Sequence, residues 1–242
     1  MELNRILEKQ KVYSQGKINA ITLSSYEKDF ELTFTHNSTA IEGNTLTLME
    51  TKVVLEDGIS VGGKELREIY EVINHKKAYQ YVKKCIAEGK ALDEHIVKDI
   101  HAILTENIIV GGIYRNQEVR SSGAGHVPPV GNDMYNQIKR FYDDLVWKKG
   151  SLNPIEYAAW THAEFVRIHP FIDGNGRMSR LLMNYQLISD GFLPVSIAKE
   201  NRLDYYNALE AYALQRELEQ FVDLVAELEE DQLDTYIKLI ER

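Results

Sequence analysis

The turn at residues 169–180 constrains the fold of this chain more than any other segment. It reads His-Pro-Phe-Ile-Asp-Gly-Asn-Gly-Arg-Met-Ser-Arg and lies between two stretches whose apolar side chains have helical spacing. The first stretch opens with Asn-Pro at 153–154, which are preferred at the N-cap and first position of a helix. The second runs to Gly191, a typical helix stop. The sequence therefore predicts helices near 154–167 and 176–190 that meet at a glycine-containing corner.

The residues of this corner are suited to binding an anion. Gly174 and Gly176 carry no Cβ that would hinder a ligand from approaching the backbone amides at the start of the second helix. The partial positive charge of that helix end adds to Arg177 and Arg180, which lie three residues apart and share one helix face. Two guanidinium groups exceed the needs of a single phosphate, which favours a polyphosphate.

A carboxylate and a base complete the constellation. Asp173 beside a positive loop favours a hard cation that bridges it to phosphates, because Mg²⁺ is commonly held by one or two carboxylates and phosphate oxygens. His169 can accept a proton at the other end of the loop. A glycine turn or a His before Pro is more often structural when it stands alone, and only the combination favours a site. The segment has neither the Walker spacing nor the Rossmann fingerprint.

At these residues the chain resembles the Fic family, whose motif His-x-Phe-x-(Asp/Glu)-Gly-Asn-Gly-Arg-x-x-Arg is matched at every specified position. The similarity extends from about residue 36 to about residue 215. It implies a mainly α fold, a Fic-type helical bundle with a small β-hairpin flap over the active site. It also implies AMPylation, the transfer of AMP from ATP to a Ser, Thr or Tyr hydroxyl of a target protein with release of pyrophosphate.

The resemblance implies a role for each motif residue. His169 is expected to act as the general base, and Asp173 to hold Mg²⁺ or Mn²⁺ against the phosphates. Phe171 is expected to anchor the loop in the core. Nucleotide contacts are expected from Gly174, Asn175, Gly176, Arg177 and, at the γ-phosphate, Arg180. A kinase-like branch of the family carries Lys where this chain has Gly176, and is therefore disfavoured.

Two further segments extend the implied site. The segment from Gly112 to Pro129 resembles the family's flap, which aligns an extended segment of the target by strand addition, with Ser122 and Gly123 at the nucleotide. The alternative is an ordinary Gly/Ser-rich loop. Tyr205 and Tyr206 match a tyrosine pair near the nucleotide in related enzymes, although they could equally be core aromatics of a helix.

The second informative segment is 38–44, Ser-Thr-Ala-Ile-Glu-Gly-Asn. Thr39 and Glu42 have the spacing of a capping box, while Gly43 is a typical helix stop. The simplest interpretation from the residues is a short helix ending at Glu42, followed by a second helix that starts with the box of Thr47 and Glu50. A carboxylate at a helix C-terminus faces the negative end of the dipole, so it needs a positive partner.

The Fic family supplies that partner. Its inhibitory helix has the pattern Ser/Thr-x-x-x-Glu-Gly/Asn, which Ser38, Glu42 and Gly43 match. The resemblance implies that Glu42 pairs with Arg180. The N-terminal placement resembles the class with inhibitor and catalytic core in one chain, and the surrounding residues are similar to the metazoan endoplasmic-reticulum member of the family.

Length and periodicity predict one compact helical unit, because no Pro/Ser-rich linker divides the 242 residues. We expect an N-terminal helical region with the inhibitory motif at 1–90, a Fic core at 91–216 and a C-terminal helix at 217–242. The strand signal is confined to about 117–128. Helices are expected near 2–12, 18–42, 47–57, 64–88, 93–106, 132–149, 154–167, 176–190, 200–215 and 217–241.

Charge and hydropathy exclude several partners. A net charge of −9 and a pI near 5.3 argue against a nucleic-acid surface. The sequence has no signal-like N-terminus and no run of 18 apolar residues, so neither membrane nor secretion is supported and the cytoplasm is the default. The last helix is interpreted as a solvated flank, or as a homodimer contact. Its apolar stripe is Leu218, Phe221, Val222, Val225, Leu228 and Leu233.

Three functional hypotheses remain from the sequence. The first is an autoinhibited AMPylase, with auto-modification as one outcome. The second is a hydrolase that uses the same site to remove AMP, with Glu42 positioning water. The third is a nucleotide-binding regulator without turnover. His169 and Asp173 argue against the third, because a pure binder needs no base.

Overall fold

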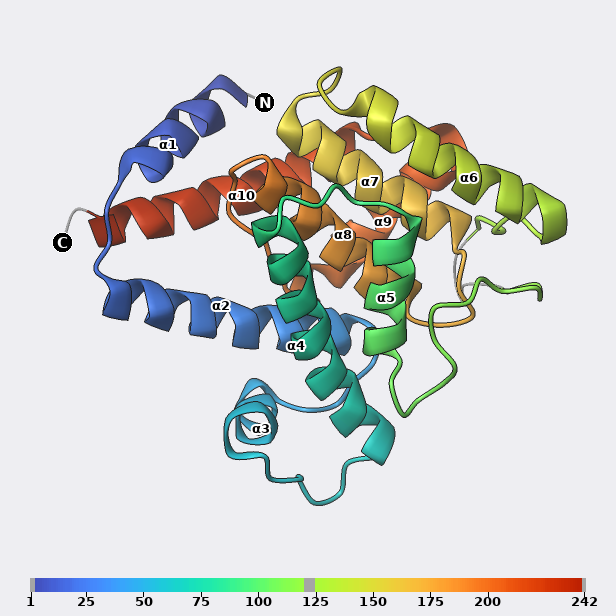
Figure 1. The fold of residues 1–242 in the computed structure, drawn as a ribbon, viewed down its shortest axis with the longest axis horizontal. Coiled ribbons are helices and arrows are strands. Elements are labelled where there is room, and N and C mark those ends of the chain that lie inside the picture. The colour runs from blue at the N-terminus through green and yellow to red at the C-terminus, as the bar shows by residue number, and fades with distance from the viewer. Residues whose placement is uncertain (1–2, 120–124, 241–242) are drawn as a thin grey trace.

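The computed structural model describes residues 3–119 and 125–240 (Figure 1). Its described residues form ten α-helices. In chain order these are α1 Leu3–Gln15, α2 Ala20–Ile41, α3 Leu48–Lys52, α4 Leu66–Ala87, α5 Glu94–Leu104, α6 Gly131–Lys148, α7 Pro154–Ile168, α8 Asn175–Ser189, α9 Arg202–Gln215 and α10 Glu219–Ile240. A π-helical turn, Val53–Asp57, continues α3, and a short 3₁₀ turn, Lys199–Asn201, precedes α9.

Side-chain caps start the helices that flank the site. The Asn153 side chain accepts from the Glu156 N–H, and the Glu156 carboxylate accepts from the Asn153 N–H at 3.3 Å. Thr47 and Glu50 form the same reciprocal box at the start of α3. The sequence predicted the box of Thr47 and Glu50 and the N-cap role of Asn153, whereas the return bond from Glu156 was not predicted. Each box satisfies backbone donors that the first helical turn leaves free.

The helix expected near 18–42 is confirmed as the 22-residue helix α2, so no separate short helix ends at Glu42. The Thr39 hydroxyl donates to the Thr35 carbonyl at 2.9 Å, as a side chain in a helix interior does. The predicted capping box of Thr39 and Glu42 is therefore wrong, and Glu42 is the C-cap of α2. The predicted end of the helix at Glu42 is correct.

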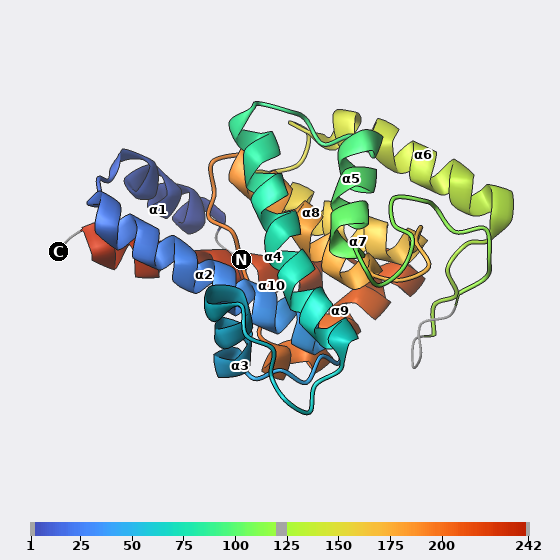
Figure 2. The same cartoon turned by 60° about the horizontal axis from the view of Figure 1, so that its bottom comes forward.

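Helices α7 and α8 form the centre of the bundle and pack against each other along their lengths (Figure 1). Around this pair, α4 contacts α8, α6 contacts α7, and α10 contacts both α7 and α1. One core cluster contains Ile6, Phe34, Phe171 and Phe221, so the three regions expected from the sequence share a single hydrophobic core. Helix α4 contacts both α2 and α8, and Figure 2 shows it beside α2.

A second, smaller apolar cluster supports the start of α4. It consists of Leu46, Val54, Ile69 and Val72. These side chains join the turn after α2, the π-helical turn and the first turns of α4. The cluster fixes the N-terminal half of α4 beside the turn that carries Glu42.

The apolar stripe of α10 is used inside this chain. Phe221, Val225 and Leu233 are fully buried, while Leu218, Val222 and Leu228 pack against the same core. The prediction of a dimer contact through this stripe is therefore wrong, whereas the acidic face with Asp223, Glu227 and Asp231 is exposed, as expected of a solvated flank. Intramolecular packing against α7 and α1 already covers the stripe.

The predicted β-hairpin flap is not confirmed. The described residues contain no β-strand, and the described residues 117–119 and 125–130 are irregular. Ser122 and Gly123 lie outside the described residues. Within the described part of the chain, no helix is both long and apolar enough to cross a membrane.

Candidate active site

The loop between α7 and α8 is held by its own residues. His169 ends α7 in the left-handed conformation with φ 54°, and Gly174 begins α8 with φ 78°. The Asn175 side chain accepts from the Phe171 N–H at 3.0 Å and donates to the Phe171 carbonyl at 2.9 Å. Because this amide is buried and bonds to both backbone groups of Phe171, Asn175 closes the loop.

Phe171 anchors the loop in the core, as the sequence predicted. It is fully buried and stacks on the His101 ring with 3.6 Å between centroids and an interplanar angle of 5°. His101 Nδ1 accepts from the Gly112 N–H at 2.9 Å, so the other ring nitrogen, Nε2, carries the proton and donates to the Asp173 carbonyl at 3.0 Å. Burial lowers the pKa of His101 to about 4 and keeps the ring neutral.

The role of His101 was not expected from the sequence. No histidine outside the motif has metal-ligand spacing to another, so no local pattern distinguishes His101. The contact to Asp173 spans 72 residues of sequence and could not be read from local pattern.

The geometry leaves one ring nitrogen of His169 able to accept a proton. A carbonyl oxygen can only accept, so the 3.3 Å contact of Nδ1 with the Val166 carbonyl places the proton on Nδ1 and leaves Nε2 unprotonated. Burial, with a contribution from Arg115, lowers the pKa of His169 below 6.5. Its neutral form therefore prevails at neutral pH.

Asp173 and Arg177 lie together at the start of α8. Arg177 Nη2 is 3.2 Å from one Asp173 oxygen, and that oxygen also accepts from the Gly174 N–H at 2.5 Å. Burial acts to raise the pKa of Asp173, but Arg177, the Gly174 N–H and Arg67 outweigh it and hold the pKa below its usual value. Arg177 is 2% exposed, and its Nε and Nη1 have no hydrogen-bond partner among the described residues.

Arg180 points away from Arg177, towards the end of α2. Its Nη2 donates to Glu42 Oε1 at 2.7 Å and to the Ser38 carbonyl at 2.7 Å, while Nε donates to the Ser38 hydroxyl at 2.9 Å. The predicted pairing of Glu42 with Arg180 is confirmed as a contact. Arg180 is 1% exposed, so Glu42 pairs with a buried guanidinium group.

The Glu42 carboxylate lies against the backbone at the start of α8. A Cβ added to Gly176 would be 2.1 Å from Glu42 Oε1, which is far closer than two atoms can approach. A side chain at position 176 would therefore displace the Glu42 carboxylate from this arrangement. Glu42 takes the place beside the backbone that the sequence assigned to a phosphate. Gly43 follows in a positive-φ turn, with φ 101°.

The two tyrosines differ in their surroundings. Tyr205 is 1% exposed, and its hydroxyl accepts from Arg180 Nη1 at 3.0 Å. That hydroxyl also lies 3.0 Å from His162 Nε2. Tyr205 thus supports Arg180 from the core, which matches the alternative of a core aromatic. Tyr206 is 44% exposed and donates to the Ile41 carbonyl at 3.2 Å, so it is the member of the pair that can reach a nucleotide.

Both ends of the segment that resembles the flap are attached beside His169. Arg115 Nε donates to the His169 carbonyl at 2.7 Å, and the Arg115 N–H donates to the Pro170 carbonyl at 2.9 Å. On the far side of the segment, His126 Nε2 contacts the Arg167 carbonyl at 2.9 Å. These contacts place the segment next to the base, even though its described residues form no strand.

Comparison with known proteins gives a consistent result. A family model described as the Fic/DOC family matches residues 91–187. The chain is 37% identical over 205 residues to the protein adenylyltransferase Fic of Drosophila willistoni, which covers 84% of this chain and 41% of that protein. The corresponding protein of Drosophila grimshawi is also 37% identical, with 42% of its length covered. The chain thus spans well under half the length of these curated relatives.

Solved structures resemble the whole described chain. A Fic-domain-containing signaling protein from Bacteroides thetaiotaomicron has a TM-score of 0.88 and 25% identity, covering 100% of this chain and 97% of that one. Fic-1 from C. elegans has a TM-score of 0.87 and 27% identity, covering 99% of this chain and 72% of that one. With the motif at 169–180 and these matches together, the chain belongs to the Fic/DOC family.

Proposed function

We propose that this protein is an autoinhibited protein adenylyltransferase, which transfers AMP from ATP to a Ser, Thr or Tyr hydroxyl of a target protein. One observation carries the proposal: His169, with Nε2 unprotonated, stands at the start of the loop that leads into the anion-binding end of α8. The name of the curated relatives, protein adenylyltransferase Fic, supports the same activity.

The loop residues fit a polyphosphate with a divalent cation. The buried Nε of Arg177 has no hydrogen-bond partner in the described residues, and its Nη1 has only the ion pair with Glu71 at 3.3 Å, so phosphate oxygens would supply the missing hydrogen bonds. Asp173 offers a carboxylate whose side chain is 33% exposed. Among the described residues no three acidic, His or Cys side chains gather to hold a metal, so phosphate oxygens would have to complete the coordination. Held there, Mg²⁺ or Mn²⁺ would neutralise charge on the departing pyrophosphate.

The proposed step needs one base and two anion-binding arginines. The target hydroxyl oxygen forms a bond to the α-phosphorus, and the bond from that phosphorus to the oxygen bridging to the β-phosphate breaks. The hydroxyl proton passes to His169 Nε2. Arg177 and a released Arg180 hold the phosphates that leave as pyrophosphate. The segment between Arg115 and His126 is the candidate surface for an extended stretch of the target.

Inhibition follows from the position of Glu42. While its carboxylate holds Arg180 and lies against Gly176, the phosphates cannot take the same place. Two unit charges about 4 Å apart attract by roughly 4 kcal/mol at an effective dielectric of about 20, before desolvation is subtracted. A net bias of about 1.4 kcal/mol towards the closed contact is enough to reduce the competent population about tenfold.

Removal of AMP from a modified protein is the second candidate function, and one observation supports it. Glu42 uses Oε1 for Arg180, and its side chain is 33% exposed, so the other oxygen can accept a hydrogen from a water molecule beside the loop. A carboxylate in that position could orient water for attack on a phosphodiester. Both activities would use the same site.

The proposed function is tested with ATP labelled at either the α- or the γ-phosphate. We expect the protein to acquire the label, or to attach it to proteins of a cell lysate, from α-labelled ATP only. His169→Ala should reduce the rate about 10²- to 10⁴-fold with nearly unchanged ADP affinity by calorimetry, because the base acts on the hydroxyl and leaves the phosphates bound.

His95→Ala is the matched control, because His95 is an exposed histidine of α5. Transfer of the γ-label, or full activity of His169→Ala, would refute the adenylyltransferase. Tight ADP binding without transfer, even in Glu42→Gly, would favour the nucleotide-binding regulator.

A further inference from the structure

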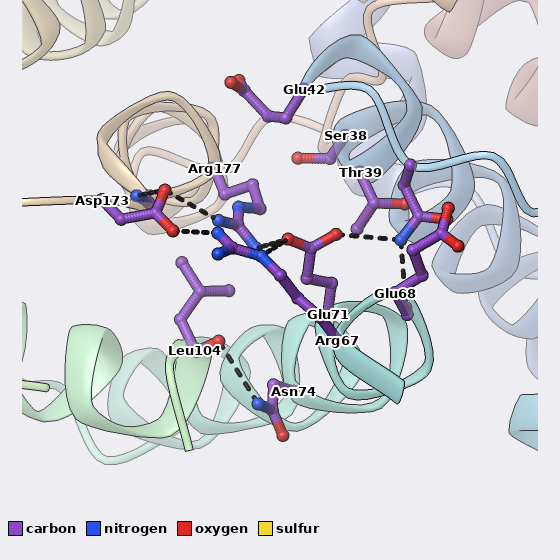
Figure 3. A network of polar contacts seen from close by, with 12 residues as sticks. Ser38, Thr39, Glu42, Arg67, Glu68, Glu71, Asn74, Leu104, Asp173 and Arg177 are labelled. Carbon is purple, nitrogen blue, oxygen red and sulfur yellow. Dashed lines mark hydrogen bonds and ion pairs between the residues drawn. The ribbon is translucent and has the colours of Figure 1, made fainter. Parts of the chain in front are cut away.

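Helix α4 brings an arginine and a glutamate into the candidate active site, and neither was expected from the sequence. Figure 3 shows Arg67 and Glu71 of α4 meeting Asp173 and Arg177. Arg67 Nη2 donates to the outer oxygen of Asp173. Glu71 Oε1 lies 3.3 Å from Arg177 Nη1. The positive side chain of α4, Arg67, therefore pairs with Asp173. The negative one, Glu71, pairs with Arg177.

The two α4 side chains are also partners of each other. Arg67 Nε donates to Glu71 Oε1 at 3.2 Å, one helical turn away. Glu71 is held in turn by Asn44, whose amide donates to Glu71 Oε2 at 3.0 Å (Figure 3). Arg67 can therefore leave Asp173 and still keep a carboxylate partner.

The charges of this arrangement match those of the ligand proposed above. A divalent cation would bring positive charge to Asp173, and phosphates would bring negative charge to Arg177. Arg67 already places a positive charge at Asp173, and Glu71 already places a negative charge at Arg177. We propose that Arg67 is an internal substitute for the divalent cation, which neutralises Asp173 when no metal is bound and must be displaced when metal and nucleotide bind.

This inference rests on the proposed function, because it assumes that Asp173 holds the cation. The difference in exposure shows which side chain moves. The Arg67 side chain is 51% exposed, whereas those of Glu71 and Arg177 are 11% and 3% exposed. Arg67 can swing into solvent at little cost, while Glu71 is fixed by Asn44 and the core. Arg67 is therefore the mobile half of the pair.

The role makes Arg67 a residue that sets the metal dependence of nucleotide binding. With metal present, Arg67 competes for Asp173 and weakens binding. Without metal, Arg67 shields the approaching phosphates from the Asp173 charge and strengthens binding. A general loss of positive charge would instead weaken the binding of an anionic nucleotide under both conditions. The two explanations therefore predict opposite changes of nucleotide affinity in the presence of metal when Arg67 is removed.

The test is calorimetric titration of ADP into the wild type and Arg67→Gln, in excess Mg²⁺ and in EDTA. We expect Arg67→Gln to tighten ADP binding about two- to fivefold in Mg²⁺, the range for losing an exposed ion pair. In EDTA it should weaken ADP binding. The dissociation constant in EDTA divided by that in Mg²⁺ should therefore be larger for Arg67→Gln than for the wild type.

Lys84→Gln is the matched control. It removes one positive charge and one i,i+4 ion pair from the same helix, at a side chain that is 69% exposed. Equal changes of affinity in Mg²⁺ and EDTA, or the same changes in Lys84→Gln, would overturn the role of Arg67 and leave the proposed function standing. ADP binding that is independent of Mg²⁺ in the wild type would overturn both this inference and the metal site at Asp173. A thermal melt of each variant confirms that the helix is intact.

Discussion

His169 is tuned by its surroundings to remain an unprotonated base below neutral pH. Burial lowers its pKa most, and the charge of Arg115 adds to that effect. The backbone carbonyl of Val166 opposes the shift by holding the Nδ1 proton, but it also orients the ring. Asp173, at the other end of the loop, is held ionised by Arg177 and the Gly174 N–H. The two groups can therefore serve as base and as metal ligand at the same pH.

We predict the pH dependence of AMP transfer from this arrangement. Because the base is active when neutral, kcat/KM should be constant at neutral pH and fall on acidification with an apparent pKa below 6.5. Rates of α-label transfer measured from about pH 5 to 8 on the Glu42→Gly background test this. An acidic limb with an apparent pKa above 6.5 would contradict the buried, neutral state of His169.

At the scale of elements, α5 fixes the catalytic loop through a single side chain. His101 stacks on Phe171, accepts from the Gly112 N–H and donates to the Asp173 carbonyl. It thus links α5, the segment after it and the loop before α8. No other described side chain hydrogen-bonds to the Asp173 carbonyl.

His101→Ala should therefore destabilise the fold and misplace the loop. Loss of a buried ring, together with two backbone groups left without partners, should cost roughly 2–4 kcal/mol. Denaturant midpoints measure the stability, and kcat should fall more than KM rises because the loop carries the base. His95→Ala, on the exposed side of the same helix, should stay within about 0.5 kcal/mol. Equal midpoints for the two variants would show that His101 does not support the loop.

The elements that follow local rules could be predicted from the sequence. Asn153 with Pro154, and Thr47 with Glu50, mark helix starts by hydrogen bonds between neighbouring residues, and these helices were expected in the right place. The single helix expected over 47–57 is in fact α3 and a π-helical turn, because a wider turn is not visible in apolar spacing.

The part of the site that depends on tertiary contact could not be predicted. The motif at 169–180 and Glu42 were found because each lies in a short recognisable pattern. Arg67, Glu71 and His101 reach the loop from 70 or more residues away, and nothing in their local sequence distinguishes them from ordinary helix residues. The box suggested by Thr39 and Glu42 does not form, because the helix expected near 18–42 is continuous through Thr39.

At the scale of the whole molecule, α10 closes the core around a buried carboxyl group. Glu229 is fully buried, accepts from the Leu193 N–H at 2.9 Å, and its second oxygen has no hydrogen-bond partner in the described residues. Burial raises the pKa of Glu229 well above its usual value. The folded protein therefore keeps a proton that the unfolded chain releases.

The sign of the resulting pH dependence is fixed. Because the folded state binds more protons than the unfolded state above the usual pKa of Glu, Glu229 makes stability fall as pH rises through that range. Glu229→Gln keeps the acceptor for Leu193 and removes the ionisation, so its melting temperature should decline less between about pH 5 and 8 than that of the wild type. Identical slopes in the two proteins would contradict a protonated Glu229.

The central claim is that Glu42 restrains the enzyme by occupying Arg180 and the backbone of Gly176, and one measurement tests it most directly. The initial rate of AMP transfer from α-labelled ATP should rise about tenfold or more in Glu42→Gly. The rate should be lost when Arg180→Ala is added, because the released arginine is needed for the phosphates. Glu50→Gly, which removes a helix-capping carboxylate eight residues away, should cost about 1 kcal/mol of stability without changing the rate. If Glu42→Gly lowers the melting temperature in the same way while AMP transfer stays at the wild-type rate, Glu42 is only a structural residue and the account of inhibition is wrong.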